Sequence, residues 1–131
     1  MKKLPEEKIV AIIPALNEEA TIARVIKVLS DSKRFDEIIV VDGASEDNTA
    51  KISEAMGAKV IRETGREGKG AAMKKGLEST DAGIVIFFDA DLVGLTKEHI
   101  FQLVDPVLGR KRRCAWAQEA IGADCHILLP G

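Results

Sequence analysis

The sequence predicts an α/β fold in which a mainly parallel sheet carries helices on both faces. Strand-like apolar runs alternate with segments whose apolar residues recur at helical spacing, and short connections join them. The chain has 131 residues, of which 46% are hydrophobic. One domain over residues 1–131 can therefore bury a core.

The first strand is predicted at Lys8–Pro14, an apolar run. Asn17 follows it as a candidate N-cap. A helix is expected next, because apolar residues then recur at helical spacing: Ile22, Val25, Ile26 and Leu29. Two interpretations of Asn17 and Glu18 stay open at this point. They serve the helix alone, as its cap and a first-turn acid, or they belong to a binding site.

Two further strands are predicted at residues 36–42 and 58–63. The segment between them begins with turn residues, continues as a helix and ends at Gly57, a typical C-terminal glycine. Asp42 ends the earlier strand. Its carboxylate either accepts hydrogen bonds from a base or sugar, or belongs to a polar turn over residues 42–48.

A glycine-rich loop over residues 64–70 precedes a helix that Gly76 interrupts. Arg66 and Lys69 stand beside glycines that let backbone amides approach an anion, and the helix adds a positive N-terminal end. Phosphate binding is one interpretation and a charged surface loop is the other. The segment matches neither the Rossmann nor the P-loop motif.

The fourth strand, residues 83–88, has no polar alternation and is expected to be buried on both faces. Asp89 and Asp91 follow it directly. Side chains alternate along an extended segment, so both carboxylates can point to one side. Mg²⁺ or Mn²⁺ would relieve their repulsion and leave coordination positions for phosphate oxygens. The alternative is that one aspartate caps the next turn and the other is solvated.

A last helix is predicted over residues 96–109, with Thr96 as its N-cap and a break or restart at Pro106. The tail over residues 109–131 differs in character, because it holds both cysteines and the single tryptophan. The cysteines lack the spacing of a zinc site or a disulfide framework and are expected to be free thiols.

Composition and charge argue against two classes of function, nucleic-acid binding and membrane spanning. The net charge is −2, so bulk charge indicates no nucleic-acid partner, and the basic run at residues 109–114 is typical of a solvated surface. The sequence shows no signal peptide and no apolar run near the ~20 residues that cross a bilayer. A cytoplasmic protein is expected.

The candidate residues follow the carboxyl ends of the predicted strands, where α/β sheets bind ligands. Four motifs occur in this order: "IVAIIPALNEEATI", "IIVVDGASEDNTA", "GREGKGAAMKKGL" and "IVIFFDADL". Together they resemble the nucleotide-sugar-binding half of a GT-A glycosyltransferase over residues 8–108. The resemblance is closest to family 2 enzymes of the dolichyl-phosphate mannosyltransferase and glucosyl-3-phosphoglycerate synthase types.

The resemblance implies transfer of a sugar from a UDP- or GDP-sugar to an unknown acceptor, with Mg²⁺ or Mn²⁺. It also assigns a role to each matching residue. On the nucleoside side, Pro14, Ala15 and Glu18 would line the pocket and Asp42 would contact the base. On the diphosphate side, Lys69 would approach the phosphates or nucleoside, Asp89 would lie near the ribose or a metal-bound water, and Asp91 would ligate the metal. Gly43 departs from the family, because many members carry a second aspartate there.

Members of this family usually continue into an acceptor-binding half, so a truncated or frameshifted transferase is expected. A noncatalytic nucleotide-sugar-binding or assembly module is an alternative. A sugar nucleotidyltransferase is another, but it would carry a glycine-rich loop with arginine after the first strand, where this chain has "PALNEE". A half-domain would expose a sheet edge, so a homodimer or larger assembly is expected.

Overall fold

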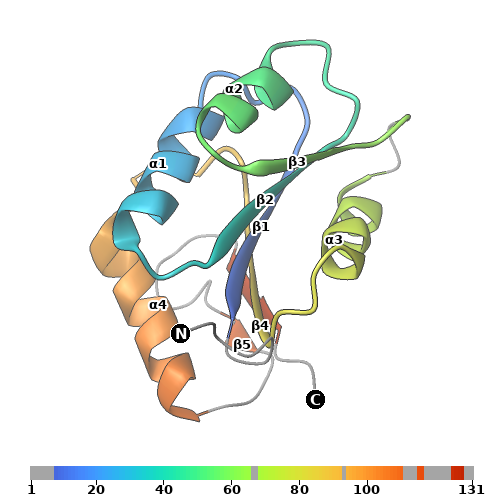
Figure 1. The fold of residues 1–131 in the computed structure, drawn as a ribbon. Helices are drawn as coiled ribbons and strands as arrows, with labels where there is room; N and C mark the ends of the chain where they lie inside the picture. The colour runs from blue at the N-terminus through green and yellow to red at the C-terminus, as the bar shows by residue number, and fades with distance from the viewer. Residues whose placement is uncertain (1–7, 66–67, 93, 111–114, 117–124, 129–131) are drawn as a thin grey trace.

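One twisted sheet organises the chain in the computed structural model, which describes residues 8–65, 68–92, 94–110, 115–116 and 125–128 (Figure 1). Within these residues the strand order is β3-β2-β1-β4-β6-β5. The mainly parallel sheet is confirmed, because the first four strands pair in parallel and only β6, among the described strands, runs in the opposite direction. The strands are β1 (Ile9–Ala15), β2 (Glu37–Asp42), β3 (Lys59–Arg62), β4 (Ile84–Phe88), β5 (Ala115–Trp116) and β6 (Cys125–Leu128).

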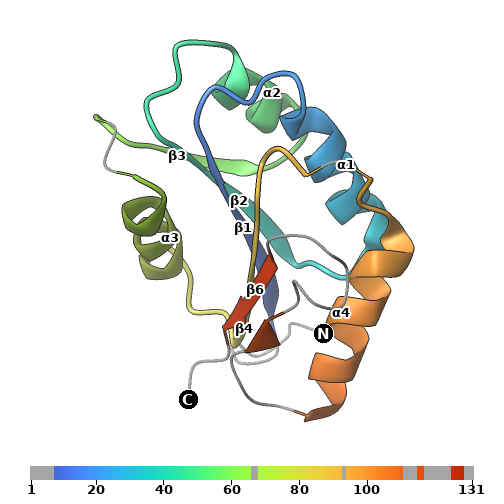
Figure 2. The same cartoon turned by 180° about the vertical axis from the view of Figure 1, so that it is seen from behind.

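The helices cover both faces of the sheet, as predicted. α1 (Ile22–Ser32) and α4 (Lys97–Arg110) pack on one face, where α2 (Thr49–Ala55) also adds Ile52. α3 (Lys69–Glu78) packs on the other face (Figure 2). No helix in the described part of the chain has the length and apolarity to span a bilayer.

Alternate residues of the central strands supply the two layers of the core. Ile9, Ala11 and Ile13 of β1 pack in the layer beneath α1 and α4, while Val10 and Ile12 face α3. All five residues of β4 are buried, which confirms the prediction from its unbroken apolar run. Burial on both faces explains why neither strand shows polar alternation.

The start of α1 corrects one expectation. Asn17 is not its N-cap, because the helix begins at Ile22 and Thr21 is the N-cap residue. Asn17 instead adopts a left-handed conformation with φ 55°. Its side-chain oxygen accepts a hydrogen bond from the amide of Glu46 at 2.8 Å, so its polar group serves a neighbouring loop and not the helix.

The course of α4 corrects a second expectation. Thr96 exchanges hydrogen bonds with His99, each at 3.3 Å, which confirms it as the N-cap. The helix then continues through Pro106 to Arg110 without a break. A proline removes one backbone donor, and the buried side chains of Ile100 and Val104 hold the helix against the sheet.

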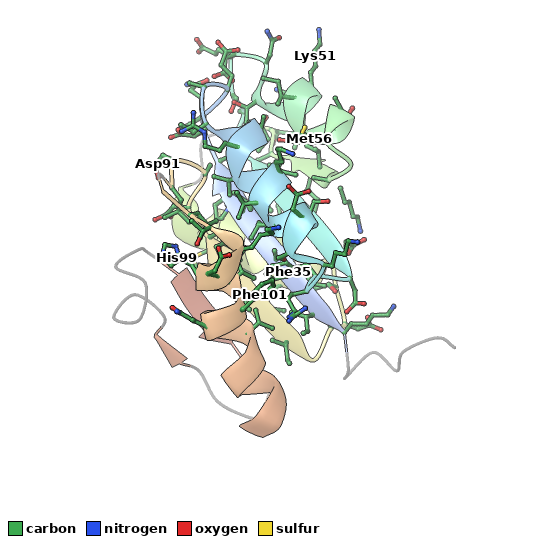
Figure 3. All side chains as sticks on the ribbon, turned by 90° about the vertical axis from the view of Figure 1, so that its left-hand side faces the viewer. Phe35, Lys51, Met56, Asp91, His99 and Phe101 are labelled. Atoms are coloured by element: carbon green, nitrogen blue, oxygen red, sulfur yellow. The ribbon has the colours of Figure 1, made fainter. Side chains whose placement is uncertain are left out.

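Two contacts of aromatic rings add to the packing on the side of the sheet that carries α1 and α4. The rings of Phe35 and Phe88 meet edge to face with centroids 5.7 Å apart. The Arg34 guanidinium lies 4.4 Å from the centre of the Phe101 ring. Phe35 and Phe101 therefore lie on the same side of the molecule, along α1 and α4 (Figure 3).

We predict that Gly76→Ala destabilises the fold although alanine favours helices. A Cβ at Gly76 would lie 2.6 Å from Cγ2 of Ile12, a fully buried and β-branched side chain. Overpacking of this kind costs about 1–3 kcal/mol and outweighs the ~1 kcal/mol gained in helix propensity. Urea denaturation should show a lower free energy of unfolding.

Gly70→Ala in the same helix is the matched control. A Cβ at Gly70 meets nothing within 4 Å, so this variant should keep or raise the free energy of unfolding. Equal stability of the two variants would contradict the close approach of α3 to β1.

Candidate functional site

A cleft of about 600 Å³ opens at the carboxyl ends of the parallel strands. The chain leaves β1 towards β2 and β3 on one side and later returns to β4 on the other. The gap between β1 and β4 is thus the switch point of the sheet, where α/β folds bind ligands. The volume lies within the usual range for small-molecule sites.

The β1–α1 loop forms one wall of the cleft. Pro14, Ala15, Leu16 and Glu18 line it, so the structure brings together the three residues predicted from this loop. Leu16 was not predicted. It is the exposed large hydrophobic residue of the described chain, at 41% exposure, and an exposed apolar side chain beside a cleft can pack against a flat ring.

The turn after β4 forms a neighbouring wall of the cleft. Asp89 and Asp91 line the cleft together with Ala90. Asp91 is exposed, Asp89 is half-buried and Ala90 is buried between them. Asp91 lies on the loop that joins β4 to α4 (Figure 3). Both aspartates therefore border one space, although residues 90 and 91 form a turn and not the extended segment on which the prediction was based.

The donor set fits a hard cation that also binds phosphate. The described residues contain no cluster of three or more His, Cys, Asp or Glu that would enclose a metal. Asp89 and Asp91 supply carboxylate oxygens at the rim of an open cleft. Mg²⁺ is usually held in this way, by one or two carboxylates with substrate phosphates and water completing its coordination.

Asp42 is fully buried and does not itself line the cleft, whereas the next residue, Gly43, does. Its Oδ2 accepts hydrogen bonds from Arg62 Nε at 3.1 Å and from the Ser45 amide at 3.3 Å. Its Oδ1 is buried and has no partner among the described residues. An unsatisfied buried carboxylate oxygen is costly, so this atom is a candidate acceptor for a ligand donor.

Glu63 is a cleft residue that the sequence analysis missed. It follows β3 directly, lines the cleft and is 4% exposed. Lys75 Nζ lies 3.7 Å from its carboxylate and offsets the buried charge. The signal was present in the sequence, because an acid at the end of a parallel strand faces the same edge as Asp42.

The glycine-rich loop reaches the cleft through Gly68 and Ala72. Gly68 has φ 96°, which glycine tolerates, and precedes the first turn of α3. Arg66 lies outside the described residues, as does the side chain of Lys69. Their predicted contacts with phosphate therefore stay predictions.

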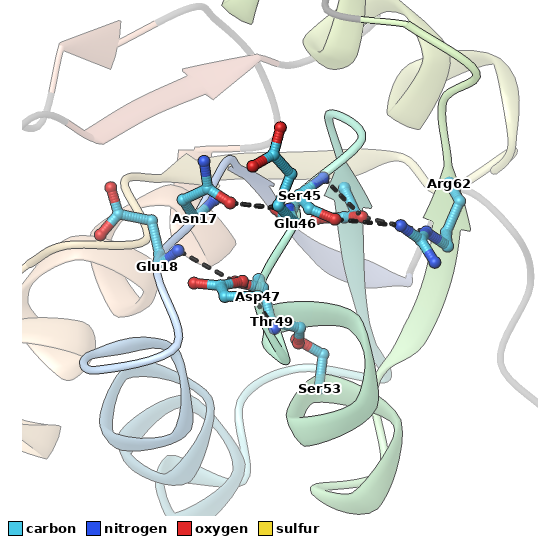
Figure 4. A network of polar contacts seen from close by, with 9 residues as sticks. Asn17, Glu18, Ser45, Glu46, Asp47, Thr49, Ser53 and Arg62 are labelled. Carbon is cyan, nitrogen blue, oxygen red and sulfur yellow. Dashed lines mark hydrogen bonds and ion pairs between the residues drawn. The ribbon is translucent and has the colours of Figure 1, made fainter.

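Hydrogen bonds across two loops fix the wall formed by the β1–α1 loop (Figure 4). The amide of Asn17 donates to Ser45 Oγ at 2.8 Å, and the amide of Glu18 donates to Thr49 Oγ1 at 2.9 Å. The Thr49 hydroxyl in turn donates to Asp47. The bonds from the Asn17 and Glu18 amides join residues 28 and 31 positions apart. They hold in place the segment that borders the cleft.

Asp47 is the ionised centre of this network. Burial would raise the pKa of its carboxyl, but hydrogen bonds from the Thr49 hydroxyl, the Thr49 amide and the Glu19 amide outweigh that effect. The pKa of Asp47 consequently lies below its ordinary value. Its carboxylate is charged at neutral pH and acts as an acceptor for both loops.

A second cleft of about 570 Å³ lies at the opposite edge of the sheet. It is lined by residues at the amino ends of the strands, among them Lys8, Glu37 and Lys59, and by Asp81. None of the predicted site residues lies there. The candidate site is therefore the cleft at the carboxyl ends.

Solved structures of a related enzyme share this architecture. Glucosyl-3-phosphoglycerate synthase from Mycobacterium tuberculosis, in complex with Mn²⁺, UDP and glucosyl-3-phosphoglycerate, is 38% identical and superposes with a TM-score of 0.70. The match covers 78% of this chain and 40% of that one. The same enzyme with Mn²⁺, UDP-glucose and phosphoglyceric acid gives a TM-score of 0.71 at the same identity and coverage. These structures have the GT-A fold, so the predicted fold class is confirmed.

Curated relatives agree with this result. Glucosyl-3-phosphoglycerate synthase from Mycobacterium tuberculosis is 41% identical over 106 residues, which cover 74% of this chain and 33% of the relative. The 4,4'-diaponeurosporenoate glycosyltransferase of Staphylococcus haemolyticus is 39% identical over 104 residues, covering 75% of this chain and 28% of the relative. The chain thus spans about a third of the length of these relatives. Residues 10–118 match the model of Glycosyl transferase family 2, and the chain belongs to that family.

Proposed function

We propose that this chain binds a UDP-sugar together with Mg²⁺ or Mn²⁺ and serves transfer of the sugar to an acceptor. The observation that carries the proposal is the position of Asp89 and Asp91 at the rim of the cleft, beside the β1–α1 loop. Solved structures of the related synthase hold UDP with Mn²⁺ or with Mg²⁺. GDP is the alternative nucleotide.

Each wall of the cleft would have its own task in donor binding. Pro14, Ala15 and Leu16 present an apolar surface suited to a flat base and a ribose. Asp91 would ligate the cation and Asp89 would assist through the metal or the ribose. A bound cation supplies Lewis acidity that stabilises the diphosphate leaving group. Glu18 lines the cleft beside the aspartate turn, because the Thr21 hydroxyl contacts both its carboxylate and the Ala90 carbonyl. Its carboxylate can accept a hydroxyl hydrogen bond from the donor.

The acid-rich cleft explains why a cation is needed. Glu18, Glu63, Asp89 and Asp91 all line it, and a diphosphate brings further negative charge to the same space. Lys75 lies 3.7 Å from the Glu63 carboxylate and offsets its charge. A divalent cation at the two aspartates would convert the repulsion between carboxylate and phosphate into attraction.

The acceptor is not assigned. Relatives of nearly equal identity are named for unlike molecules, one for its product glucosyl-3-phosphoglycerate and the other for its substrate 4,4'-diaponeurosporenoate. The shared part of the chain therefore supports the donor and leaves the acceptor class open.

We predict that UDP binding depends on Mn²⁺ and that Asp91→Ala removes this dependence. Calorimetric titration of UDP with and without Mn²⁺ should show metal-enhanced affinity, and the variant should lose about tenfold or more, ~1.4 kcal/mol. GDP, titrated in parallel, is expected to bind more weakly. Asp81→Ala is the matched control, because Asp81 lines the opposite cleft. Retained metal dependence in Asp91→Ala would sink the metal assignment, and absence of UDP binding would sink the donor assignment.

We also predict that Asp42→Asn shifts the base preference. Arg62 and Ser45 both donate to Oδ2 of Asp42. In the variant these two donors would face the oxygen of the new side-chain amide, which leaves its NH₂ group at the position of Oδ1. An NH₂ repels the N3–H of uracil but can donate to the N3 of cytosine. UDP affinity should fall by about tenfold while CDP affinity falls less or rises. Equal losses for both nucleotides would mean that Asp42 only holds the loop that begins at Gly43.

A further inference from the structure

We infer that Thr21 is a positioning residue that fixes the Asp89–Asp91 turn and thereby couples cation binding to nucleotide binding. The inference rests on the proposed function, since it names a residue outside the cleft lining that acts on the same site. It follows from the hydrogen bond of Thr21 to Ala90, 69 positions away, which this side chain makes in place of a helix-capping bond.

The hydroxyl of Thr21 donates to the carbonyl oxygen of Ala90 at 2.8 Å. A longer contact of 3.4 Å joins the same hydroxyl to Glu18 Oε2. A hydroxyl carries one proton, so the shorter bond to Ala90 takes it. Ala90 is 4% exposed and Thr21 is half-buried, so the bond is partly shielded from competing water.

The Thr21 side chain bonds the turn after β4 instead of capping helix α1. Thr21 is the N-cap residue of α1, but its side chain makes no capping hydrogen bond. A threonine cap normally accepts a hydrogen bond from a backbone amide in the first turn and stabilises the helix. Here the helix start is closed by backbone bonds to the Glu18 carbonyl from Thr21 and Ile22. The hydroxyl is therefore directed at the turn after β4.

The bonded carbonyl lies at the centre of the metal-binding turn. Ala90 is the residue between the two aspartates, and rotation of its peptide would move both of their side chains. The turn itself is closed by a long bond of 3.4 Å from the Leu92 amide to the Asp89 carbonyl. The bond from Thr21 is shorter, at 2.8 Å, and joins this turn to the β1–α1 connection.

The same residue is connected to the nucleoside wall. Glu18 lines the cleft three positions before Thr21, and its amide is held by the Thr49 hydroxyl at 2.9 Å. The path from the loop after β2 to the aspartates thus runs through Thr49, Glu18, Thr21 and Ala90. Ordering of one wall by a nucleotide would order the other wall for the cation, which is positive coupling between two ligands.

Isosteric substitution separates this role from general support of the fold. Thr21→Val keeps the shape and removes the hydroxyl, whereas Thr21→Ser keeps the hydroxyl. Thr80→Val is the control at the far edge of the sheet, where Thr80 lines the second cleft. UDP affinity would be measured by calorimetry with and without Mn²⁺ for all four proteins.

In Thr21→Val the tightening of UDP by Mn²⁺ should fall by about fivefold or more, while affinity without Mn²⁺ stays within about twofold of the unsubstituted chain. Thr21→Ser should restore the tightening and Thr80→Val should leave it unchanged. Hydrogen exchange without ligand should be faster over residues 89–92 in Thr21→Val, because the turn has lost its tie.

Equal loss of UDP affinity with and without Mn²⁺ in Thr21→Val would show a general structural role and overturn the inference. Unchanged metal dependence would also overturn it, as would unchanged exchange over residues 89–92. Failure of the unsubstituted chain to bind UDP in either condition would instead overturn the proposed function. In that case the exchange measurement still decides whether Thr21 holds the turn.

Discussion

The parallel pairing of β1 with β2 and β4 is the constraint on which the rest of the structure depends. Ala15 pairs with Asp42 and Ile12 with Phe87, so the strands end at nearly the same level. Their ends then deliver the β1–α1 loop, Gly43 and Asp89 to one edge. Because both faces of β1 and β4 are buried, a shift of register would expose apolar side chains and is strongly disfavoured. Rigid strands therefore place a site that is itself built from loops.

Polar side chains complete what the strands begin. The connections after β1, β2 and β4 contact one another through the side chains of Asn17, Thr49 and Thr21. Each of these side chains lies in one connection and bonds a backbone group of another. Loops of this kind would otherwise sample many conformations, and each ordered residue costs roughly 1–2 kcal/mol of backbone entropy. The hydrogen bonds offset part of that cost before any ligand arrives, so the site is largely preorganised.

The sequence predicted the sheet, the helices on both faces and the strand ends that carry acids, because these follow from periodicity and from the chain order of strands and helices. It did not predict the role of Asn17. Asparagine favours both N-caps and the left-handed region for the same reason, a short polar side chain close to the backbone. Only the loop 28 positions away decides between them. Glu63 was missed because its burial depends on α3, which brings Lys75 to it. Antiparallel pairing of β6 with β4 is likewise a long-range contact.

The placement of the site also bears on which step of the reaction this chain can determine. The described cleft residues lie between Pro14 and Asp91, so the first four strands and their connections supply the whole of that surface. Relatives that share this segment at 39–41% identity bear different names, a glucosyl-3-phosphoglycerate synthase and a 4,4'-diaponeurosporenoate glycosyltransferase. Under the proposed function, a donor site lined by the first four strands and their connections could serve different acceptors, because the acceptor would need only to reach the sugar at the open side of the cleft. The turn at Asp89 and Asp91 would then be the boundary between the two parts: it would hold the leaving group from the donor side and present the sugar to the part of the molecule beyond β4.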